Sequence, residues 1–204
     1  MTDDIVTTVD LLRHGEPEGG VRYRGSLDDP LSERGWAQLR AAVGGYRPWN
    51  VIVSSPLRRC AAFAQALAGE HGLALEIEPR LREINFGEWE GRTVAEIMAA
   101  TPEALSRFWR DPVAYPPPGG EPLGDYAALI AAAWYDLLER HSGRQVLVIG
   151  HGGMIRLVLR QVLDIPLKRI WRLEVPYATL SRVRIHGRGA AAEPSLVFHG
   201  KGQE

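Results

Sequence analysis

The chain has 204 residues, of which 45% are hydrophobic, and its formal net charge at pH 7 is −1. This length suits one domain over residues 1–204, and a charge near zero without long runs of one sign argues against broad electrostatic binding to nucleic acid. No apolar run approaches the roughly 20 residues of a membrane helix and no signal segment is recognised, so we expect a cytoplasmic protein without a membrane partner. The single cysteine, Cys60, excludes an internal disulfide and is expected to pack in the core.

The first predicted strand begins near Ile5 and ends at Arg13, with His14 and Gly15 directly after it. In an α/β sheet, ligands bind outside the carboxyl ends of the strands. A cation beside an imidazole at this place indicates an anion that is bound by Arg13 and contacted or attacked by His14. A purely structural Arg–His pair is the alternative that this stretch alone leaves open.

A glycine-rich polar loop over residues 15–31 follows and carries Tyr23 and Arg24. The loop is long for a βα connection, and long loops in compact domains are often functional. Ser32 is then typical of an N-cap, and the helix after it is expected to end at Gly44.

The second predicted strand covers residues 51–53, and Ser55 and Pro56 have the pattern of an N-cap and a first helical residue. Arg58 and Arg59 would therefore lie in the first turn of a helix, where the macrodipole disfavours a cation without an anionic partner. We expect Arg58 to lie near the sheet edge that holds Arg13, and we assign Arg59 to the solvent-exposed surface.

A third strand over residues 75–78 leads into an ordered loop over 81–91 that contains Glu83, Glu88 and Glu90. The pair Thr93 and Glu96 forms the capping-box pattern of a short helix, and another helix is expected after Thr101. A Pro- and Gly-rich stretch over 111–122 precedes a helix that the apolar spacing predicts over 125–141.

The fourth strand, over residues 145–149, has the continuous apolar pattern of a parallel strand and ends at His151, between glycines. The start of the next helix favours anions, and Gly152 allows a ligand to approach the backbone closely. A ligand contact for His151 is therefore favoured over the role of a satisfied core histidine. Extended segments are expected over 170–175, over 179–185 as an outer strand, and over 196–198, with His199 at the surface.

Arg13, His14, Arg58 and His151 thus converge on one sheet edge, a set of groups that suits a phosphate. An unprotonated His14 can attack phosphorus, while the other three hold the phosphate oxygens. Glu83 is the best candidate for the proton donor, and Glu88 and Glu90 are weaker ones. The acids lack the spacing of metal ligands, so phosphoryl transfer without a metal or other cofactor is expected.

Six stretches carry a resemblance to a known family: LLRHGE, DDPLSERGWAQ, VSSPLRRC, LREINFGEWEG, PPGGE and VIGHGG. In this order they resemble the histidine phosphatase superfamily, which includes the cofactor-dependent phosphoglycerate mutases. The resemblance implies an α/β fold, a three-layer α/β/α sandwich with a mostly parallel central sheet. It also implies His14 as the phosphohistidine nucleophile, Arg13, Arg58 and His151 as the phosphate pocket, and Glu83 as the proton donor.

Within this superfamily the stretches RGSLDDPLS and FWRDPVAYPPPGGEP are most similar to the α-ribazole phosphatases of cobalamin biosynthesis. The expected partner is therefore a small phosphorylated metabolite, with Tyr23, Arg24 and Gly152 as candidate substrate contacts. Pro17 and Gly20 depart from the residues that many members have in the first loop. A mutase-type isomerase and a non-catalytic phospho-ligand-binding protein are the alternatives, and the C-terminal strands are compatible with a homodimer.

Overall fold

Six strands form one sheet in a computed structural model that describes residues 5–45 and 48–201. The strand order is β3-β2-β4-β1-β5-β6, in which β3, β2, β4 and β1 run parallel and β5 and β6 are antiparallel additions. The strands are β1 (Val6–Arg13), β2 (Val51–Ser54), β3 (Ala74–Ile77), β4 (Gln145–Gly150), β5 (Leu180–His186) and β6 (Glu193–Lys201). The predicted mostly parallel α/β sheet is confirmed.

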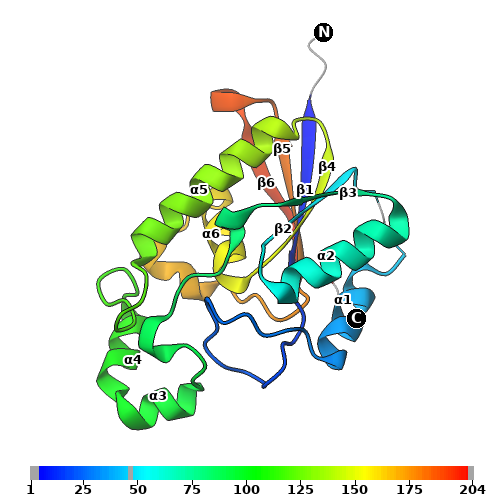
Figure 1. Cartoon of the computed structure of the whole chain (residues 1–204). Coiled ribbons are helices and arrows are strands. Elements are labelled where there is room, and N and C mark those ends of the chain that lie inside the picture. Colours follow the sequence, from blue (N-terminus) through cyan, green and yellow to red (C-terminus); the bar gives the residue numbers. More distant parts are fainter. Residues whose placement is uncertain (1–4, 46–47, 202–204) are drawn as a thin grey trace.

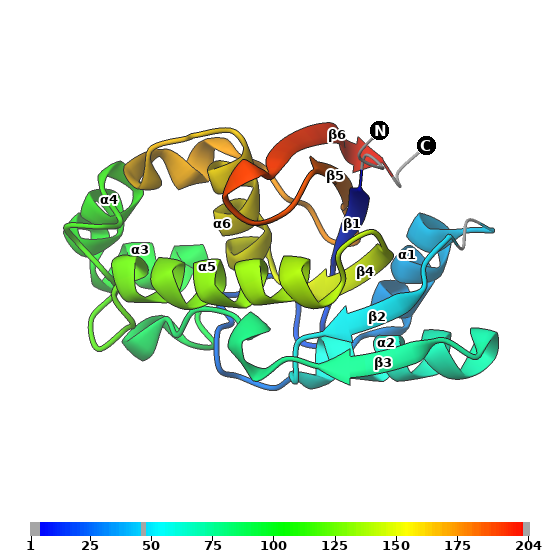
Figure 2. The same cartoon turned by 90° about the horizontal axis from the view of Figure 1, so that it is seen from above.

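Helices cover both faces of this sheet (Figures 1 and 2). α1 (Glu33–Val43) and α2 (Arg58–His71) lie on one face, and α5 (Leu123–Arg140) and α6 (Gly152–Val162) on the other. The capping signals act locally as expected: the Ser32 side chain accepts from Gly35 N, and Gly44 and Gly72 end α1 and α2 with positive φ. In the described part of the chain, no helix is long and apolar enough to cross a membrane.

The alternation of side chains along β4 divides the core between the two faces. Val146 and Val148 pack in the cluster that contains α5 and α6, whereas Leu147 and Ile149 pack with α1 and α2. Because both faces are covered, the central strand is apolar along its whole length rather than at every second residue. Burial of the strand on both faces fixes the register that positions its carboxyl end.

Two short helices, α3 (Val94–Ala100) and α4 (Pro102–Arg110), lie away from the sheet, on the side of the loop between β1 and α1 (Figure 1). The predicted capping box of α3 is confirmed, because Thr93 and Glu96 exchange both hydrogen bonds. Phe108 of α4 is buried and lies edge-to-face with Trp89, their ring centroids 5.2 Å apart. These contacts connect the two helices to the main core.

Three predicted elements of the C-terminal part differ from the structure. The first three residues of the segment predicted as extended over 170–175 belong to a 3-10 helix (Leu167–Arg172), and the last strand is nine residues long rather than three. β5 is not an outer strand, since it pairs with both β1 and β6. Its Arg182 makes two hydrogen bonds to the buried Asp10 carboxylate, at 2.7 and 2.8 Å, so the charged alternation reflects an internal ion pair.

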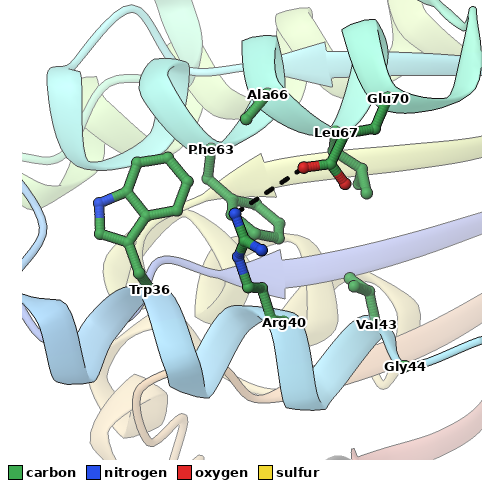
Figure 3. Close-up of a pocket in the computed structure, with 8 residues that line it drawn as sticks. All are labelled: Trp36, Arg40, Val43, Gly44, Phe63, Ala66, Leu67 and Glu70. Atoms are coloured by element: carbon green, nitrogen blue, oxygen red, sulfur yellow. Dashed lines mark ion pairs between the residues drawn. The ribbon is translucent and has the colours of Figure 1, made fainter.

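A groove of about 170 Å³ separates α1 and α2 on the outer face of the molecule (Figure 3). Its floor is apolar, with Val43, Phe63 and Leu67, and an ion pair between Arg40 and Glu70 at 3.8 Å spans it. None of the predicted site residues lines this groove. The predicted site residues Arg13, His14 and His151 lie instead at the carboxyl ends of β1 and β4.

Candidate active site

Three neighbouring strands deliver side chains to one edge of the sheet. In the strand register Arg13 of β1 pairs with Gly150 of β4, and Ser54 of β2 pairs with Ile149. The residues that follow these ends, His14 and His151, therefore lie next to each other, with ring centroids 5.2 Å apart. This is the crevice at which open α/β sheets bind ligands.

His14 is buried and is held as one neutral tautomer. Its Nδ1 lies 2.7 Å from Gly15 O, and because a carbonyl only accepts hydrogen bonds, Nδ1 carries the proton and Nε2 keeps its lone pair. Burial lowers the pKa of His14 well below its usual value, and the nearby charges of Arg13 and Arg59 lower it further. The ring is thus unprotonated at neutral pH, which is the form that a nucleophilic histidine requires.

Arg13 lies near this ring, and one N–H group of its guanidinium makes no hydrogen bond to the described residues. Its Nη1 donates to Val175 O at 2.5 Å, and its Cζ lies 4.2 Å from the centroid of the Tyr177 ring. Its Nε is buried and has no hydrogen-bond partner among the described residues. A buried donor without an acceptor is costly, so this N–H is suited to an oxygen of a bound anion.

The structure corrects the assignment of the two arginines that open α2. Arg59 is fully buried, whereas Arg58, which was expected in the pocket, is exposed to solvent. Arg59 donates from Nη1 to Leu27 O at 2.6 Å and from Nη2 to Gly25 O at 3.0 Å, and its Nε is a second buried donor without a partner. The next residue, Cys60, has its Sγ 3.6 Å from His151 Nε2, and the charge of Arg59 contributes to lowering the pKa of both His14 and His151.

The helical pattern of α2 contains the signal that identifies Arg59. Buried Phe63 and Leu67 follow it at intervals of four residues, so Arg59 extends the inward-facing stripe of the helix. Arg58 is about 100° away around the helix axis and points outward. Distance from the strand end does not separate two adjacent arginines, whereas the apolar stripe of the helix does.

His151 is fully buried between β4 and α6. Its Nε2 lies 2.7 Å from the Ser55 hydroxyl, and burial together with the charge of Arg59 lowers its pKa well below the usual value. The prediction that Ser55 is the N-cap of α2 is wrong. The helix begins two residues further on with Leu57 as its N-cap, and the Ser55 side chain orients the imidazole instead.

Glu83 faces the basic groups from the loop after β3. Its Oε1 accepts from Ile84 N at 3.1 Å and from the Tyr126 hydroxyl at 3.2 Å, and its Oε2 accepts from Gly153 N at 3.1 Å. A β-carbon at Gly153 would lie 2.3 Å from Glu83 Oε1, so only glycine leaves room for the carboxylate. Glu83 is the one carboxylate among the residues that line the pocket at this edge, within the part of the chain described.

That pocket has a volume of about 170 Å³ and is both basic and aromatic. Tyr23, Arg24 and Gly152, which are predicted to contact the substrate, are among the residues that line it. The Arg24 guanidinium, however, is buried and engaged by its own loop: it donates to Asp29 Oδ2 at 2.6 Å and to the carbonyls of Gly20 and Glu18 at 2.5 Å. Its direct contribution to the site is to hold this loop in shape. The remaining lining residues are Arg13, Arg22, Glu83, Phe86, Phe108, Trp109, Gly153, Arg156 and Trp171.

Glu90 holds the loop that supports Arg59. Its carboxylate accepts from the backbone N–H groups of Gly25, Ser26 and Leu27 and from Phe86 N, at 2.9–3.1 Å. The carbonyls of Gly25 and Leu27 are the groups that bind Arg59. Glu90 is therefore a positioning residue, and it does not line the pocket. Glu88 is exposed and does not line it either.

Two features of the site were missed at the level of sequence. The Ser55 hydroxyl contacts His151, and Arg156 of α6 brings another guanidinium into the pocket. Arg156 follows Gly152 by four residues, the helical spacing at which side chains share a face, and this spacing is the signal that would have found it. Among the described residues, no group of three or more His, Cys, Asp or Glu side chains is arranged to hold a metal ion.

Comparison with known proteins agrees with this geometry. The sequence model of the histidine phosphatase superfamily (branch 1) matches residues 9–194. The bifunctional protein Rv2228c of Mycobacterium tuberculosis is 35% identical over 189 residues, which make up 89% of this chain and 51% of the relative. The chain thus spans about half the length of the first curated relatives that it matches. Glucosyl-3-phosphoglycerate phosphatase of Mycolicibacterium vanbaalenii is 37% identical over 167 residues, covering 76% of this chain and 74% of the relative.

Solved structures show the same architecture. The native structure of the mycobacterial glucosyl-3-phosphoglycerate phosphatase Rv2419c superposes with a TM-score of 0.85 at 30% identity, covering 96% of this chain and 99% of that one. The α-ribazole phosphatase of Shigella flexneri gives a TM-score of 0.80 at 23% identity, with 95% and 96% covered. At that identity the second likeness shows the fold alone.

Proposed function

Because the chain belongs to the histidine phosphatase superfamily, we propose that it is a phosphomonoesterase that acts on a small phosphorylated metabolite through a phosphohistidine on His14. The observation that carries this proposal is the tautomer of His14, whose Nδ1 proton is fixed on Gly15 O so that Nε2 is free to attack. Two buried guanidinium N–H groups, on Arg13 and Arg59, lie beside this ring without protein acceptors among the described residues. They supply the positive charge that phosphoryl transfer requires without a metal ion.

In the first half-reaction the phosphate group binds between Arg13, Arg59 and His151. His14 Nε2 attacks phosphorus in line with the ester oxygen, a N–P bond forms and the P–O bond to the leaving group breaks. The alcohol leaves with a proton from Glu83, the pocket's carboxyl group. The charge on the phosphoryl oxygens is held throughout by guanidinium groups that the fold has already desolvated and oriented.

In the second half-reaction Glu83, now a carboxylate, accepts a proton from water. The water oxygen attacks phosphorus, the N–P bond breaks, and inorganic phosphate leaves while His14 recovers its lone pair. Ile84 N, Gly153 N and the Tyr126 hydroxyl donate to this carboxylate and hold it in position. One cycle thus restores both residues to their starting protonation states.

The leaving group contacts the basic and aromatic part of the pocket. The motif similarity predicts α-ribazole 5′-phosphate, and the relatives of higher identity offer glucosyl-3-phosphoglycerate as a second candidate. The ring centroid of Tyr23 lies 5.0–6.3 Å from those of Phe86, Trp89 and Phe108, so packed aromatic rings form this wall of the pocket. A direct comparison of hydrolysis rates decides which of the two candidates is the substrate.

The test is a comparison of phosphate release from α-ribazole 5′-phosphate, glucosyl-3-phosphoglycerate, 3-phosphoglycerate and an aryl phosphate, in the absence of a bisphosphate. Stoichiometric release from at least one compound, abolished in His14→Ala, is the expected result. Isomerisation of 3-phosphoglycerate that depends on an added bisphosphate would assign the chain to the mutases instead. Binding of these compounds without any turnover would assign it to phospho-ligand-binding proteins.

A further inference from the structure

Tyr177 contacts both members of the Arg13–His14 pair, from a segment that phosphoryl transfer as described above does not use. Its ring centroid lies 4.2 Å from Arg13 Cζ and 5.6 Å from the centroid of the His14 ring. Tyr177 does not line the pocket that is expected to hold the leaving group. Its contacts are therefore with the end of the site at which phosphorus reacts.

The backbone next to Tyr177 is bonded to the same two residues. Ala178 N donates to His14 O at 3.2 Å, and Arg13 N donates to Thr179 O at 3.0 Å. Ala178 has a φ of 55°, in the left-handed region that a residue with a β-carbon adopts only at a cost in free energy. The hydrogen bonds to the pair hold the chain in this conformation, so the place of Tyr177 over Arg13 is built into the backbone.

The start of this segment is held by the last strand of the sheet. The Nε2 of His199, in β6, lies 2.6 Å from Glu174 O, and because a carbonyl only accepts hydrogen bonds, Nε2 is the donor. Glu174 precedes Val175, whose carbonyl accepts from Arg13 Nη1. The segment is thus fixed on both sides of Tyr177.

An aromatic ring supports the Arg13 guanidinium without using any of its N–H groups. The donors of a guanidinium lie in its plane, whereas a ring attracts the cation through its face. A carboxylate in the same place would accept from these donors and neutralise the charge. Burial lowers the pKa of Arg13, and its Nε has no hydrogen-bond partner among the described residues. The Tyr177 ring therefore stabilises a poorly solvated cation and leaves Nε open to a phosphoryl oxygen.

We infer that Tyr177 is a positioning residue for phosphoryl transfer, and that its ring holds the Arg13 guanidinium in the orientation from which Nε reaches the phosphoryl group. Within the part of the chain described, the Arg13 side chain makes one hydrogen bond, from Nη1 to Val175 O, and one bond leaves a planar group free to swing about the contact. The ring over its face removes this freedom. The inference rests on the proposed function and adds a residue that acts on phosphorus only through Arg13.

The test compares an aromatic ring with an apolar side chain of smaller area at the same position. Tyr177→Leu removes the ring, and Tyr177→Phe keeps it and removes only the hydroxyl group. Phe198→Leu is the matched control, because it removes a ring that lies 5.3 Å from Arg182 Cζ and does not line the pocket. Circular dichroism checks folding, and Tyr177→Met takes the place of Tyr177→Leu if that variant does not fold.

The first measurement is the rate of phosphoryl transfer to His14 in a single turnover of 4-nitrophenyl phosphate, together with the inhibition constant of inorganic phosphate. We expect Tyr177→Leu to lower the rate by about tenfold or more, because a small misplacement of a group that contacts the transferring phosphoryl is costly. The inhibition constant should stay within about threefold of wild type, because the charge of Arg13 remains in the site.

Tyr177→Phe and Phe198→Leu should both transfer the phosphoryl group within about threefold of the wild-type rate, since each leaves the ring over Arg13 in place. Rescue by phenylalanine separates the effect of the ring from that of the hydroxyl group. An unchanged rate in Tyr177→Leu, or an equal loss in Tyr177→Phe, would overturn the inference.

The second measurement does not depend on turnover. The Nε–H signal of Arg13, assigned with Arg13→Lys, is followed by ¹H–¹⁵N NMR while orthovanadate, an analogue of the transferring phosphoryl group, is added. We expect one signal that shifts on binding in the wild-type and Tyr177→Phe proteins, and a broadened or lost signal in Tyr177→Leu. A sharp signal that shifts in the same way in Tyr177→Leu would contradict the positioning role. If the wild-type protein hydrolyses no phosphate ester, the proposed function fails, while this signal still decides the role of Tyr177.

Discussion

His14 combines burial, a fixed tautomer and two neighbouring cations, and each of these keeps the ring neutral. The Nδ1 proton is engaged by Gly15 O, so protonation has to occur at Nε2, and burial and the charges of Arg13 and Arg59 lower the pKa of the ring. Adding a positive charge there is opposed by desolvation and by Coulomb repulsion. The nucleophile therefore remains available as the pH falls, until the pH reaches the depressed pKa.

The first prediction concerns this titration. Because the pKa of His14 is lowered well below 6.5, its neutral form persists when the pH decreases from 8 through 6.5, where an unperturbed histidine gains half a proton. Imidazole ¹⁵N resonances, assigned with the His14→Gln variant, report the protonation state directly. We expect no midpoint near pH 6.5. A midpoint at or above that value would show that burial and the two arginines do not lower the pKa of the ring as described.

Arg58 and Arg59 provide an internal control for the phosphate pocket, because they are adjacent in sequence but differ in burial. We expect Arg59→Met to lower kcat/KM by about 10²–10³-fold, the usual cost of losing one preorganised donor to the transferring group. Arg58→Met should stay within about threefold of wild type, because the side chain is exposed. The measurement is steady-state hydrolysis of an aryl phosphate, and the reverse order of the two effects would restore the original assignment.

Between the elements, the loop after β1 is shaped by a residue from a different loop. Glu90 accepts four backbone hydrogen bonds, three of them from residues 25–27, and the carbonyls of Gly25 and Leu27 then fix Arg59. The Arg59 side chain thus depends on a carboxylate about thirty residues further along the chain. This explains how a long polar loop can hold the Arg59 guanidinium in a fixed position.

Replacing Glu90 by alanine is therefore expected to reduce both stability and activity. Loss of the charge-assisted bonds costs about 2–4 kcal/mol of unfolding free energy, measured by urea denaturation. Hydrolysis should fall by about tenfold or more, because a small misplacement of Arg59 is costly. Glu88→Ala is the control, since that side chain is exposed. An active and stable Glu90→Ala protein would contradict the positioning role.

Regular elements with strong local signals were predictable from sequence, whereas their inward faces were less so. The apolar run of β4, the Ser32 cap and the Thr93–Glu96 capping box each state their structure within a few residues. Ser55 carried an equally good capping signal, but the helix begins later, with Leu57 as its N-cap, and the Ser55 hydroxyl contacts His151 as well as accepting from Leu57 N. The alternation of charged and apolar residues around Arg182 predicted an exposed outer strand. The buried partner of Arg182, Asp10, lies 172 residues away in sequence, so the local pattern does not reveal the ion pair.

For the whole molecule, the sheet edge that holds the site follows from topology. Parallel strands bring Arg13, His14 and His151 together whatever the connecting loops do, so these residues were found from strand ends alone. The substrate pocket is different in kind. It is built from the β1–α1 loop, the loop at Phe86, α4 and the 3-10 segment at Trp171, whose meeting depends on long-range packing that periodicity does not report.

The most direct test of the account is to trap the covalent intermediate. The Glu83→Gln variant is mixed with 4-nitrophenyl phosphate, whose good leaving group needs no proton, and quenched in alkaline denaturant, in which phosphohistidine is stable. Because water is no longer activated, we predict a burst of about one nitrophenolate per protein and a phosphoryl group that peptide mass spectrometry locates on His14. Absence of a protein-bound phosphoryl group during turnover, or its location on another residue, would contradict the mechanism.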